Sequence, residues 1–244
     1  MRILFASLAA TTLAGVCALA PAGADDHADD MGAGTEDGFV TLFDGTSLDG
    51  WTSSLDNPAA FSVEDGVLVV KGDRAHLFYS GEVADHDFTD FELRLKVRTT
   101  EGSNSGVYFH TVYQEDDWPE IGYEAQVNST QSDPRKTGSL YSVADIYVSG
   151  EENEPALRVE NGNSFVARDE APSTDGEWFD YTIRVEGKTV TIKVDGETTV
   201  KWTEPEDWDR EGRKLASGTF ALQAHDPDSE VHYKDIRVKV LGEE

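Results

Sequence analysis

Two neighbouring segments of the sequence carry polar side chains whose types and spacing suit the binding of a polyol. In the stretch YEAQVN, Glu124, Gln126 and Asn128 fall on alternate positions, so an extended chain places them on one face about 6.6 Å apart. In the preceding stretch NSGVYFHT, Tyr108 and His110 share a face in the same way. This combination of carboxylate, amide, phenol and imidazole groups predicts a sugar-binding face. The alternative is the solvated face of an ordinary half-buried sheet, which alternation by itself also predicts.

The chemistry open to this row is limited by its single carboxylate. Glycosidases that use two acids hold the carboxyl groups about 5–5.5 Å apart, or about 6.5–9.5 Å apart when they invert. Glu124 is followed at alternate positions by Gln126 and Asn128, so this strand does not supply two acids. Asp145 or Asp226 could provide a second carboxylate from elsewhere in the fold, although both are predicted in loops or turns.

A histidine near the end of the chain is a second group that can exchange protons. Gln223 and His225 alternate with the apolar residues at 220, 222 and 224, so both are predicted on the polar face of a strand. An imidazole titrates near neutral pH and can act as acid or base, although this one could instead brace a loop. Glu124 and His225 are therefore the candidate catalytic residues, and the amides of Asn104 and Gln223 are candidate donors to substrate oxygens.

Aromatic residues are candidates for the walls of such a site. Trp118 lies in an acidic, turn-rich loop between the two segments, where an indole could stack on a sugar ring. Tyr141 and His76 are placed at the edge of the cleft, although ordinary packing would explain their positions nearly as well. The predicted substrate-binding residues are Asn104, Tyr108, His110, Trp118, Gln126, Asn128, Tyr141 and Gln223.

The elements that must position these side chains are strands. Extended segments separated by Asp-Gly and similar turns fill the sequence from Gly38 onward, and no segment has a sustained helical period. Strands are predicted at 39–43, 61–63, 67–70, 88–99, on both sides of the loop at 115–119, and at 138–148, 178–186, 189–194, 198–202, 218–226 and 231–241. Many short strands with closely spaced turns predict an all-β fold, and we expect a two-sheet antiparallel jelly-roll sandwich. Its concave face is the expected ligand site.

Length and charge restrict the class of protein. The 244 residues suffice for one β domain, predicted at 38–244 after a flexible acidic linker at 25–37. The formal net charge of −28 repels nucleic acid and anionic lipid surfaces, so neither is an expected partner. The acidic residues are spread along the chain, which is typical of a solvated surface. Binding of a divalent cation such as calcium is the alternative explanation.

The first residues predict an exported protein. Arg2, an apolar run and a small-residue A-G-A sequence form the pattern of a secretory signal peptide over 1–24, with cleavage after Ala24. Cys17 follows Ala-Gly-Val and offers lipid anchoring as the alternative. We expect a secreted or periplasmic protein without a transmembrane span. If Cys17 leaves with the signal peptide, no cysteine is left for a disulfide.

The order of several segments resembles the 3-keto-disaccharide hydrolase domain family, concanavalin A-like jelly rolls common in secreted bacterial proteins. The segments are GFVTLFDGTSLDGW, FTDFELRLKVR, NSGVYF, YEAQV, TGSLY, EWFDYTIRVEG and SGTFALQAHDPDSEVHYKDIRVKVL. No one of them is a specific motif, but their order and spacing match from Gly38 to Leu241. The family usually has an arginine at the position of His110 and often an aspartate at that of Asn128. Both differences fall on the presumed binding face.

The resemblance implies a substrate with a ketone at sugar carbon 3. Such a ketone acidifies the proton on carbon 2, so a base can remove it, the glycosidic oxygen can leave, and water can add afterwards. Glu124 or His225 would be the base. The ketone would be polarised by an amide of Asn104, Gln126 or Gln223, or by a divalent cation.

We therefore expect a secreted glycoside hydrolase or lyase that cleaves 3-keto-glycosides or 3-keto-disaccharides by proton abstraction at carbon 2, elimination and hydration. Its partner would be an oligosaccharide or glycoside. A non-catalytic, lectin-like carbohydrate-binding module using the same face is one alternative, and a calcium-binding scaffold or adhesion protein is another. Convergence of Glu124 and His225 on one pocket would favour the enzyme, because a binding module needs no acid and base within proton-transfer reach.

Overall fold

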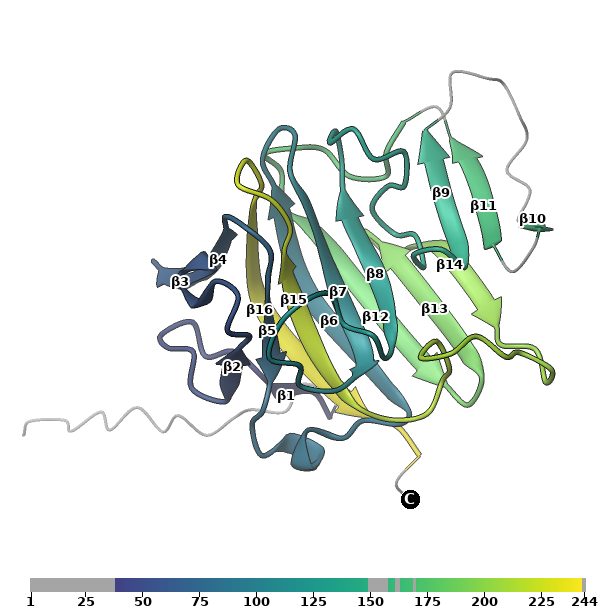
Figure 1. Cartoon of the computed structure of the whole chain (residues 1–244), viewed down its shortest axis with the longest axis horizontal. Helices are drawn as coiled ribbons and strands as arrows, with labels where there is room; N and C mark the ends of the chain where they lie inside the picture. The colour runs from purple at the N-terminus through teal and green to yellow at the C-terminus, as the bar shows by residue number, and fades with distance from the viewer. Residues whose placement is uncertain (1–37, 149–157, 161–162, 169, 243–244) are drawn as a thin grey trace, which may run out of the picture. The chain divides into compact units, whose positions relative to one another are not determined.

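The computed structural model describes residues 38–148, 158–160, 163–168 and 170–242, which form two large β-sheets and a small third one (Figure 1). The expected signal peptide and acidic linker, up to residue 37, lie outside the described residues. The two-sheet antiparallel sandwich predicted from the sequence is confirmed. Within the described part of the chain, no helix has the length and apolar character needed to span a bilayer.

The larger sheet has eight strands. They are β1 (Val40–Thr41), β3 (Phe61–Glu64), β4 (Val67–Lys71), β6 (Phe91–Thr99), β12 (Phe179–Glu186), β13 (Thr189–Val194), β14 (Glu197–Thr203) and β16 (Glu230–Val240). Their order is β14–β13–β12–β6–β16–β4–β3, and β1 pairs with β16. At the centre, Leu93 lies between Ile183 and Val238 of the flanking strands, so the register builds an apolar row across the sheet.

The second sheet has five strands and the third has three. The five strands are β2 (Trp51–Ser53), β5 (Ala75–Tyr79), β7 (Asn104–Thr111), β8 (Tyr123–Asn128) and β15 (Thr219–Ala224), in the order β2–β5–β15–β7–β8. The third sheet comprises β9 (Ala144–Val148), β10 (Arg158–Glu160) and β11 (Asn163–Arg168), with β9 and β11 parallel. Two 3-10 turns are η1 (Pro58–Ala60) and η2 (Val83–His86). The extended segment predicted at 138–148 is therefore a strand only from Ala144.

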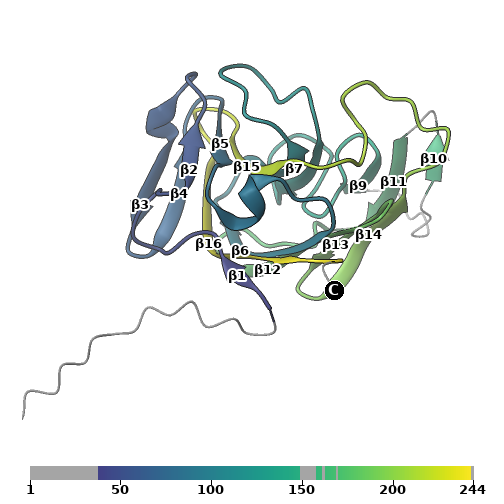
Figure 2. The same ribbon diagram turned by 90° about the horizontal axis from the view of Figure 1, so that it is seen from below.

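The core lies between the two large sheets, which Figure 2 shows as separate layers. Alternation turns Val107, Phe109, Tyr123 and Ala125 inward, where the rings of Phe109 and Tyr123 stack at 5.8 Å. The same alternation turns Tyr108, Glu124 and Gln126 to the outer face of the five-stranded sheet. The polar row predicted from the sequence is therefore placed away from the core, on the surface where β7, β8 and β15 lie side by side.

Candidate active site

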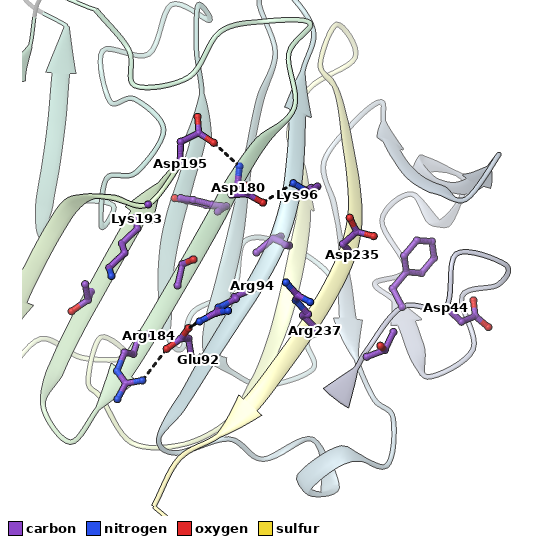
Figure 3. A pocket seen from close by; sticks show the side chains of 17 residues that line it. Asp44, Glu92, Arg94, Lys96, Asp180, Arg184, Lys193, Asp195, Asp235 and Arg237 are labelled. Carbon is purple, nitrogen blue, oxygen red and sulfur yellow. Dashed lines mark hydrogen bonds and ion pairs between the residues drawn. The ribbon is translucent and has the colours of Figure 1, made fainter. Parts of the chain in front are cut away.

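The outer face of the eight-stranded sheet has a hollow of about 810 Å³, lined by charged residues that pair with one another (Figure 3). Glu92 accepts a hydrogen bond from Arg184 at 2.9 Å, and Lys96 pairs with Asp180 at 2.7 Å. None of the residues that line this hollow is a histidine. Because its acids and bases largely neutralise each other, this surface offers little for proton transfer.

A smaller pocket of about 200 Å³ lies on the outer face of the five-stranded sheet. Its lining consists of Asn104, Tyr108, Trp118, Glu124, Gln126, Asp133, Tyr141, Arg213, Gln223 and His225. Glu124 and His225, the two residues predicted to exchange protons, are brought together here although they lie far apart in the sequence. This pocket is the candidate active site.

Glu124 is a buried carboxyl group in the wall of this pocket. It is the cross-strand neighbour of Tyr108, and the Gln223 amide donates to its Oε1 at 3.1 Å. Burial raises the pKa of Glu124 to about 7, because the loss of water disfavours the ionised form. Hydrogen bonds from Tyr108 and Gln223, and the charge of Arg213, oppose this rise without cancelling it. Near neutral pH the carboxyl therefore exists in both protonation states.

A glycine makes room for this carboxyl group. A Cβ atom added to Gly106 would lie 2.1 Å from Glu124 Oε1 and 2.7 Å from its Cδ, closer than non-bonded atoms can approach. Gly106 pairs with Gln126 across the ladder, beside the pair of Tyr108 and Glu124. The Glu124 side chain therefore lies over the bare backbone at Gly106, which gives this glycine of the NSG stretch a role in the site.

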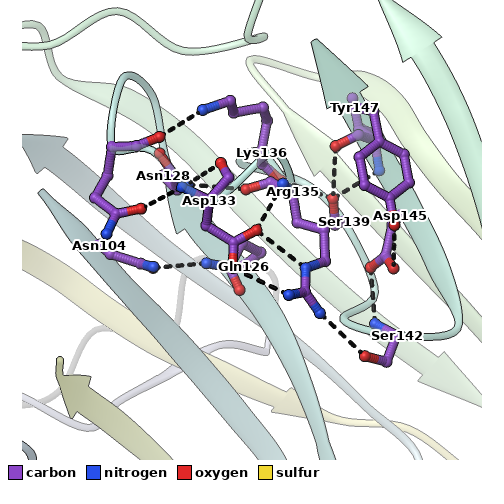
Figure 4. A network of polar contacts seen from close by, with 12 residues as sticks. Asn104, Gln126, Asn128, Asp133, Arg135, Lys136, Ser139, Ser142, Asp145 and Tyr147 are labelled. Carbon is purple, nitrogen blue, oxygen red and sulfur yellow. Dashed lines mark hydrogen bonds and ion pairs between the residues drawn. The ribbon is translucent and has the colours of Figure 1, made fainter. Parts of the chain in front are cut away.

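Hydrogen bonds fix the orientation of the His225 ring. Gln126 Nε2 donates to Asn104 Oδ1 at 2.6 Å (Figure 4), so the Asn104 amide presents Nδ2 to His225 Nε2, 3.3 Å away. An amide nitrogen only donates, so Nε2 accepts and the ring proton is on Nδ1. Nδ1 in turn donates to Asp226 Oδ2 at 2.8 Å. This tautomer leaves the lone pair of Nε2 as the proton acceptor of the ring.

Asp226 supports the His225 ring from behind. Burial by itself would raise the pKa of Asp226, but hydrogen bonds from His225 and Ser229 bring it below its ordinary value. Ser229 Oγ donates to Asp226 at 2.9 Å and accepts from the Asn104 backbone N–H at 2.9 Å. These contacts close a ring through His225. Asp226, considered above as a second catalytic carboxylate, is absent from the pocket lining and orients the imidazole instead.

Trp118 forms the exposed rim of the pocket. Its ring centroid lies 5.4 Å from that of His225 and 5.6 Å from that of His76. The Arg74 guanidinium lies 5.6 Å from the indole and also pairs with Asp117 at 2.6 Å. Trp118 is 39% exposed, so part of its ring surface is open to a ligand.

Tyr141 and Asp133 form another part of the wall, and Arg135 joins them. The segment that contains Tyr141 runs along the edge of β8 and forms backbone hydrogen bonds with that strand. In one of them the Tyr141 N–H donates to the Glu124 carbonyl at 2.9 Å. The Arg135 guanidinium lies 4.1 Å from the Tyr141 ring centroid and pairs with Asp133 at 3.0 Å. Backbone pairing and one arginine therefore fix the Tyr141 ring at the pocket.

Asn128 and Asp145 are not part of the pocket lining. Figure 4 shows both in the polar network around Asp133 and Arg135. Asn128 Nδ2 donates to the carbonyls of Asp133 and Arg135 at 3.0 and 2.9 Å, so it holds their loop. Asp145 accepts from the Ser142 backbone N–H at 2.8 Å, and burial raises its pKa to about 7. The structure thus gives Asn128 a supporting position in place of the expected ligand contact. Asp145 supplies no second carboxylate to the pocket.

The structure does not bring His110 to the pocket either. Thr219 of β15 pairs with Thr111 of β7, and Ala221, two residues later, pairs with Tyr108, three residues before Thr111. Strand β7 therefore carries one extra residue at this point, which is a β-bulge. His110 has a φ of +52°, and its Nε2 contacts the Thr89 carbonyl at 2.8 Å. The bulge breaks the alternation on which the expected shared face with Tyr108 was based.

Two lining residues, Asp133 and Arg213, were not predicted from the sequence. Arg213 reaches the pocket from the segment after β14 and donates to the Gly122 carbonyl at 2.6 Å. Its charge lowers the pKa of Glu124. Both residues lie outside strands, where no side-chain period predicts a direction. The proline after Asp133, which marks a turn, was the only local signal.

The pocket's donor set does not fit a resident divalent cation. Across the described ranges, no group of three or more histidine, cysteine, aspartate and glutamate side chains is arranged to bind a metal ion. Within the pocket, Asp133 is paired with Arg135, which leaves Glu124 as the one lining carboxylate outside an ion pair among the described residues. The chemistry proposed below is therefore assigned to protein side chains alone.

Residues 38–239 match the profile of the 3-keto-alpha-glucoside-1,2-lyase-like domain family. The chain belongs to this family. A 3-keto-disaccharide hydrolase from Bacteroides thetaiotaomicron is 24% identical over 242 residues, which covers 84% of this chain and 79% of that relative. The family resemblance stated from the sequence is thereby confirmed.

Solved structures agree with this family's fold. A crystal structure from Parabacteroides distasonis, provisionally named a glycosyl hydrolase, aligns with a TM-score of 0.59 and 20% identity over 83% of this chain and 99% of that one. A non-specific endo-β-1,3(4)-glucanase of family GH16 aligns with a TM-score of 0.50 and 13% identity over 83% and 91%. The fold is the lectin and glucanase type of jelly roll, as expected for the 3-keto-alpha-glucoside-1,2-lyase-like domain family.

Proposed function

We propose that this protein is a carbohydrate-active enzyme, related to glycosyl hydrolases, that cleaves 3-keto-glycosides by elimination and hydration. The main support is the presence in one pocket of Glu124, with a pKa of about 7, and His225, with an unprotonated Nε2. Membership of the 3-keto-alpha-glucoside-1,2-lyase-like family and a relative named 3-keto-disaccharide hydrolase support the substrate class. Export through the expected signal peptide is part of the same proposal.

In the elimination step, His225 is the base and Glu124 the acid. His225 Nε2 exchanges its hydrogen bond from Asn104 Nδ2 for the substrate and takes the proton from carbon 2. The electrons of that C–H bond form a double bond between carbons 1 and 2. The bond from carbon 1 to the glycosidic oxygen breaks, and protonated Glu124 gives its proton to that oxygen. The products are an alcohol or sugar and a 2-hydroxy-3-keto-glycal. Asp226 stabilises the imidazolium that forms.

Tyr108 is the proposed donor to the ketone oxygen. Burial raises the pKa of Tyr108 well above its ordinary value, so the phenol keeps its proton at any working pH. The amide nitrogen of Gln223 already donates to Tyr108 and Glu124, and that of Gln126 donates to Asn104. In the ligand-free site the phenol donates to the Glu124 carboxylate. Once Glu124 is protonated for the elimination step, the phenol can turn its proton towards the substrate, where it stabilises negative charge that develops on the ketone oxygen.

Hydration returns both residues to their starting states. The Glu124 carboxylate accepts a proton from water as the hydroxide adds to carbon 1. The His225 imidazolium then returns its proton to carbon 2. The sum of the two steps is hydrolysis, with no oxidant, reductant or metal consumed. An acid with a pKa near neutrality suits both directions of transfer, since it is protonated for the first step and readily ionised for the second.

The test is release of a chromogenic alcohol from its 3-keto-glucoside by wild type, Glu124→Gln and His225→Ala. We expect each variant to lower kcat/KM by at least about 10²-fold, the usual contribution of a general acid or base. Glu120→Gln and His86→Ala, at exposed positions outside the pocket, are the matched controls and should retain wild-type rates.

Non-catalytic sugar binding is the second candidate, favoured by the exposed Trp118 ring beside buried amides. Wild-type protein that binds the glycoside but releases no alcohol would support this alternative and overturn the enzyme. Release that persists in both pocket variants, with folding intact, would instead remove Glu124 and His225 from the mechanism.

A further inference from the structure

His76 is a buried histidine that the proposed mechanism does not use. It lies on β5 and is 0% exposed, and neither of its ring nitrogens has a hydrogen-bond partner among the described residues. Burial lowers its pKa to about 4, so the ring is neutral at working pH and carries one N–H donor and one acceptor nitrogen. Leaving both unpaired inside a protein is destabilising, and such groups commonly mark functional positions.

This imidazole lies directly behind the pocket wall. Its ring centroid is 5.4 Å from Tyr108 and 5.6 Å from Trp118, and both of these residues line the pocket. Its partner across the β5–β15 ladder is Gln223, another lining residue. His76 is thus separated from the pocket only by side chains that already belong to it.

Trp118 is the more exposed of the two rings that cover His76. Tyr108 is buried on β7, whereas Trp118 is 39% exposed on the loop between β7 and β8. The indole is held by ring contacts with His76 and His225 and by the Arg74 guanidinium above it. Because Trp118 lies on a loop, its side chain can change between staggered rotamers without moving a strand.

We propose that Trp118 is a rotating cover and that His76 beneath it forms a second sugar subsite beside the Glu124 pocket. This inference rests on the proposed function and adds a place for the leaving sugar of a disaccharide. In it, the imidazole N–H and the other ring nitrogen bond two hydroxyl groups of the second sugar, and the indole stacks on that sugar's face. The first sugar occupies the pocket of Glu124 and His225.

His76→Phe separates this role from ordinary packing. Phenylalanine keeps an aromatic ring but removes both unpaired nitrogens, so we expect the ligand-free variant to unfold at a higher denaturant concentration than wild type. Affinity for an α-linked glucose disaccharide should fall at least tenfold, about the effect of losing one good hydrogen bond. Affinity for methyl α-glucoside should not change, because it occupies only the first subsite. Calorimetry measures both, and neither sugar carries the ketone needed for elimination.

Nuclear magnetic resonance of the His76 ring tests directly whether the second sugar reaches this side chain. The His76 ring resonances, assigned by their loss in His76→Phe, should shift on addition of the disaccharide and stay in place with methyl α-glucoside. In Trp118→Ala the imidazole is already uncovered, so the disaccharide should bind more weakly through loss of stacking while the shift persists. His86→Phe, at an exposed histidine, should change neither affinity.

Three results would overturn the subsite. They are an unchanged ratio of disaccharide to monosaccharide affinity in folded His76→Phe, a lower stability of that variant, and failure of wild type to bind either sugar. The proposed reaction is judged separately, by alcohol release from the 3-keto-glucoside. If wild type releases the alcohol but the ratio of disaccharide to monosaccharide affinity is the same in His76→Phe, only the subsite is rejected. If that affinity ratio changes in His76→Phe but wild type releases no alcohol, only the reaction is rejected.

Discussion

Glu124 and His225 lie in different surroundings within the same pocket. Glu124 is buried, and burial outweighs the opposing charges of Arg213 and Arg135, so its pKa rises to about 7. His225 is partly exposed and donates to the Asp226 carboxylate at 2.8 Å. Groups whose environments differ in this way are the usual basis for assigning acid and base roles. The assignment of Glu124 as acid and His225 as base follows from these surroundings.

The raised pKa of Glu124 predicts a pH-dependent stability. Between its unfolded value of 4.5 and its folded value of about 7, the native state binds more protons than the unfolded state, so stability falls as pH rises. Over this interval the loss is about 3 kcal/mol, from 1.36 kcal/mol per pKa unit. We therefore expect Glu124→Gln to gain stability relative to wild type as pH rises from about 5 to about 8.

Chemical denaturation of both proteins at the two pH values provides the measurement. Asp145, whose pKa burial also raises to about 7, titrates in the same interval in both proteins and cancels in the comparison. A difference between wild type and Glu124→Gln that is the same at both pH values would show that the Glu124 carboxyl is not held protonated by the fold.

At the scale of elements, β7 controls the site through two local departures from a regular strand. Gly106 leaves space above the backbone for the Glu124 carboxyl. The bulge at the other end of the strand turns His110 away, towards the Thr89 carbonyl and the Phe91 ring, whose centroid is 5.7 Å from that of His110. One strand therefore places Tyr108 in the pocket and removes His110 from it.

Gly106→Ala is predicted to displace the acid without unfolding the sheet. The new methyl group would lie 2.1 Å from Glu124 Oε1, so the carboxyl must move away from its partners Tyr108 and Gln223. The backbone at Gly106 is in a region that alanine adopts, so the strand itself is not strained. We expect kcat/KM for the 3-keto-glucoside to fall at least about 10²-fold, as for loss of a general acid.

Gly66→Ala, in the β3–β4 turn, is the control for stability. Gly66 has a φ of +81° and open space around it, so alanine there costs about 1 kcal/mol through backbone strain. This variant should lose stability and keep its activity. Full activity in Gly106→Ala would mean that the Glu124 carboxyl does not need its position above that glycine.

At the scale of the whole molecule, a strongly acidic surface surrounds a core that no disulfide supports. The only cysteine is Cys17, outside the described domain, while the formal net charge of the chain is −28. Self-repulsion of such a charge opposes the compact state. Stability must therefore come from the apolar layer between the sheets.

Salt is predicted to stabilise this protein by screening. The Debye length falls from about 30 Å at 0.01 M to about 3 Å at 1 M ionic strength, which removes most repulsion between separate surface charges. We expect Tm to rise over this range in sodium chloride, and calcium chloride at equal ionic strength to give a similar rise. Differential scanning calorimetry measures both. A much larger rise with calcium would contradict this expectation and support a specific cation site.

The strands and the outward direction of Glu124, Gln126 and Gln223 were predictable from the sequence. The period of two in a β-strand is a local property of the backbone, so apolar and polar residues at alternate positions reveal which side chains share a face. The jelly-roll class followed from the number of strands and the turns between them. The family followed from the order of segments along the chain.

Tertiary structure alone decided which of those faces becomes a site and what its residues can do. Arg213 and Asp133 reach the pocket from loops, and one extra residue in β7 directs the His110 side chain away from it. The alternation of residues along a strand predicts neither feature. The protonation of Glu124 and the tautomer of His225 depend on burial and on hydrogen-bond partners from distant strands. Strand periodicity is set by adjacent residues, whereas burial and partner choice are set by segments that meet only when the chain has folded.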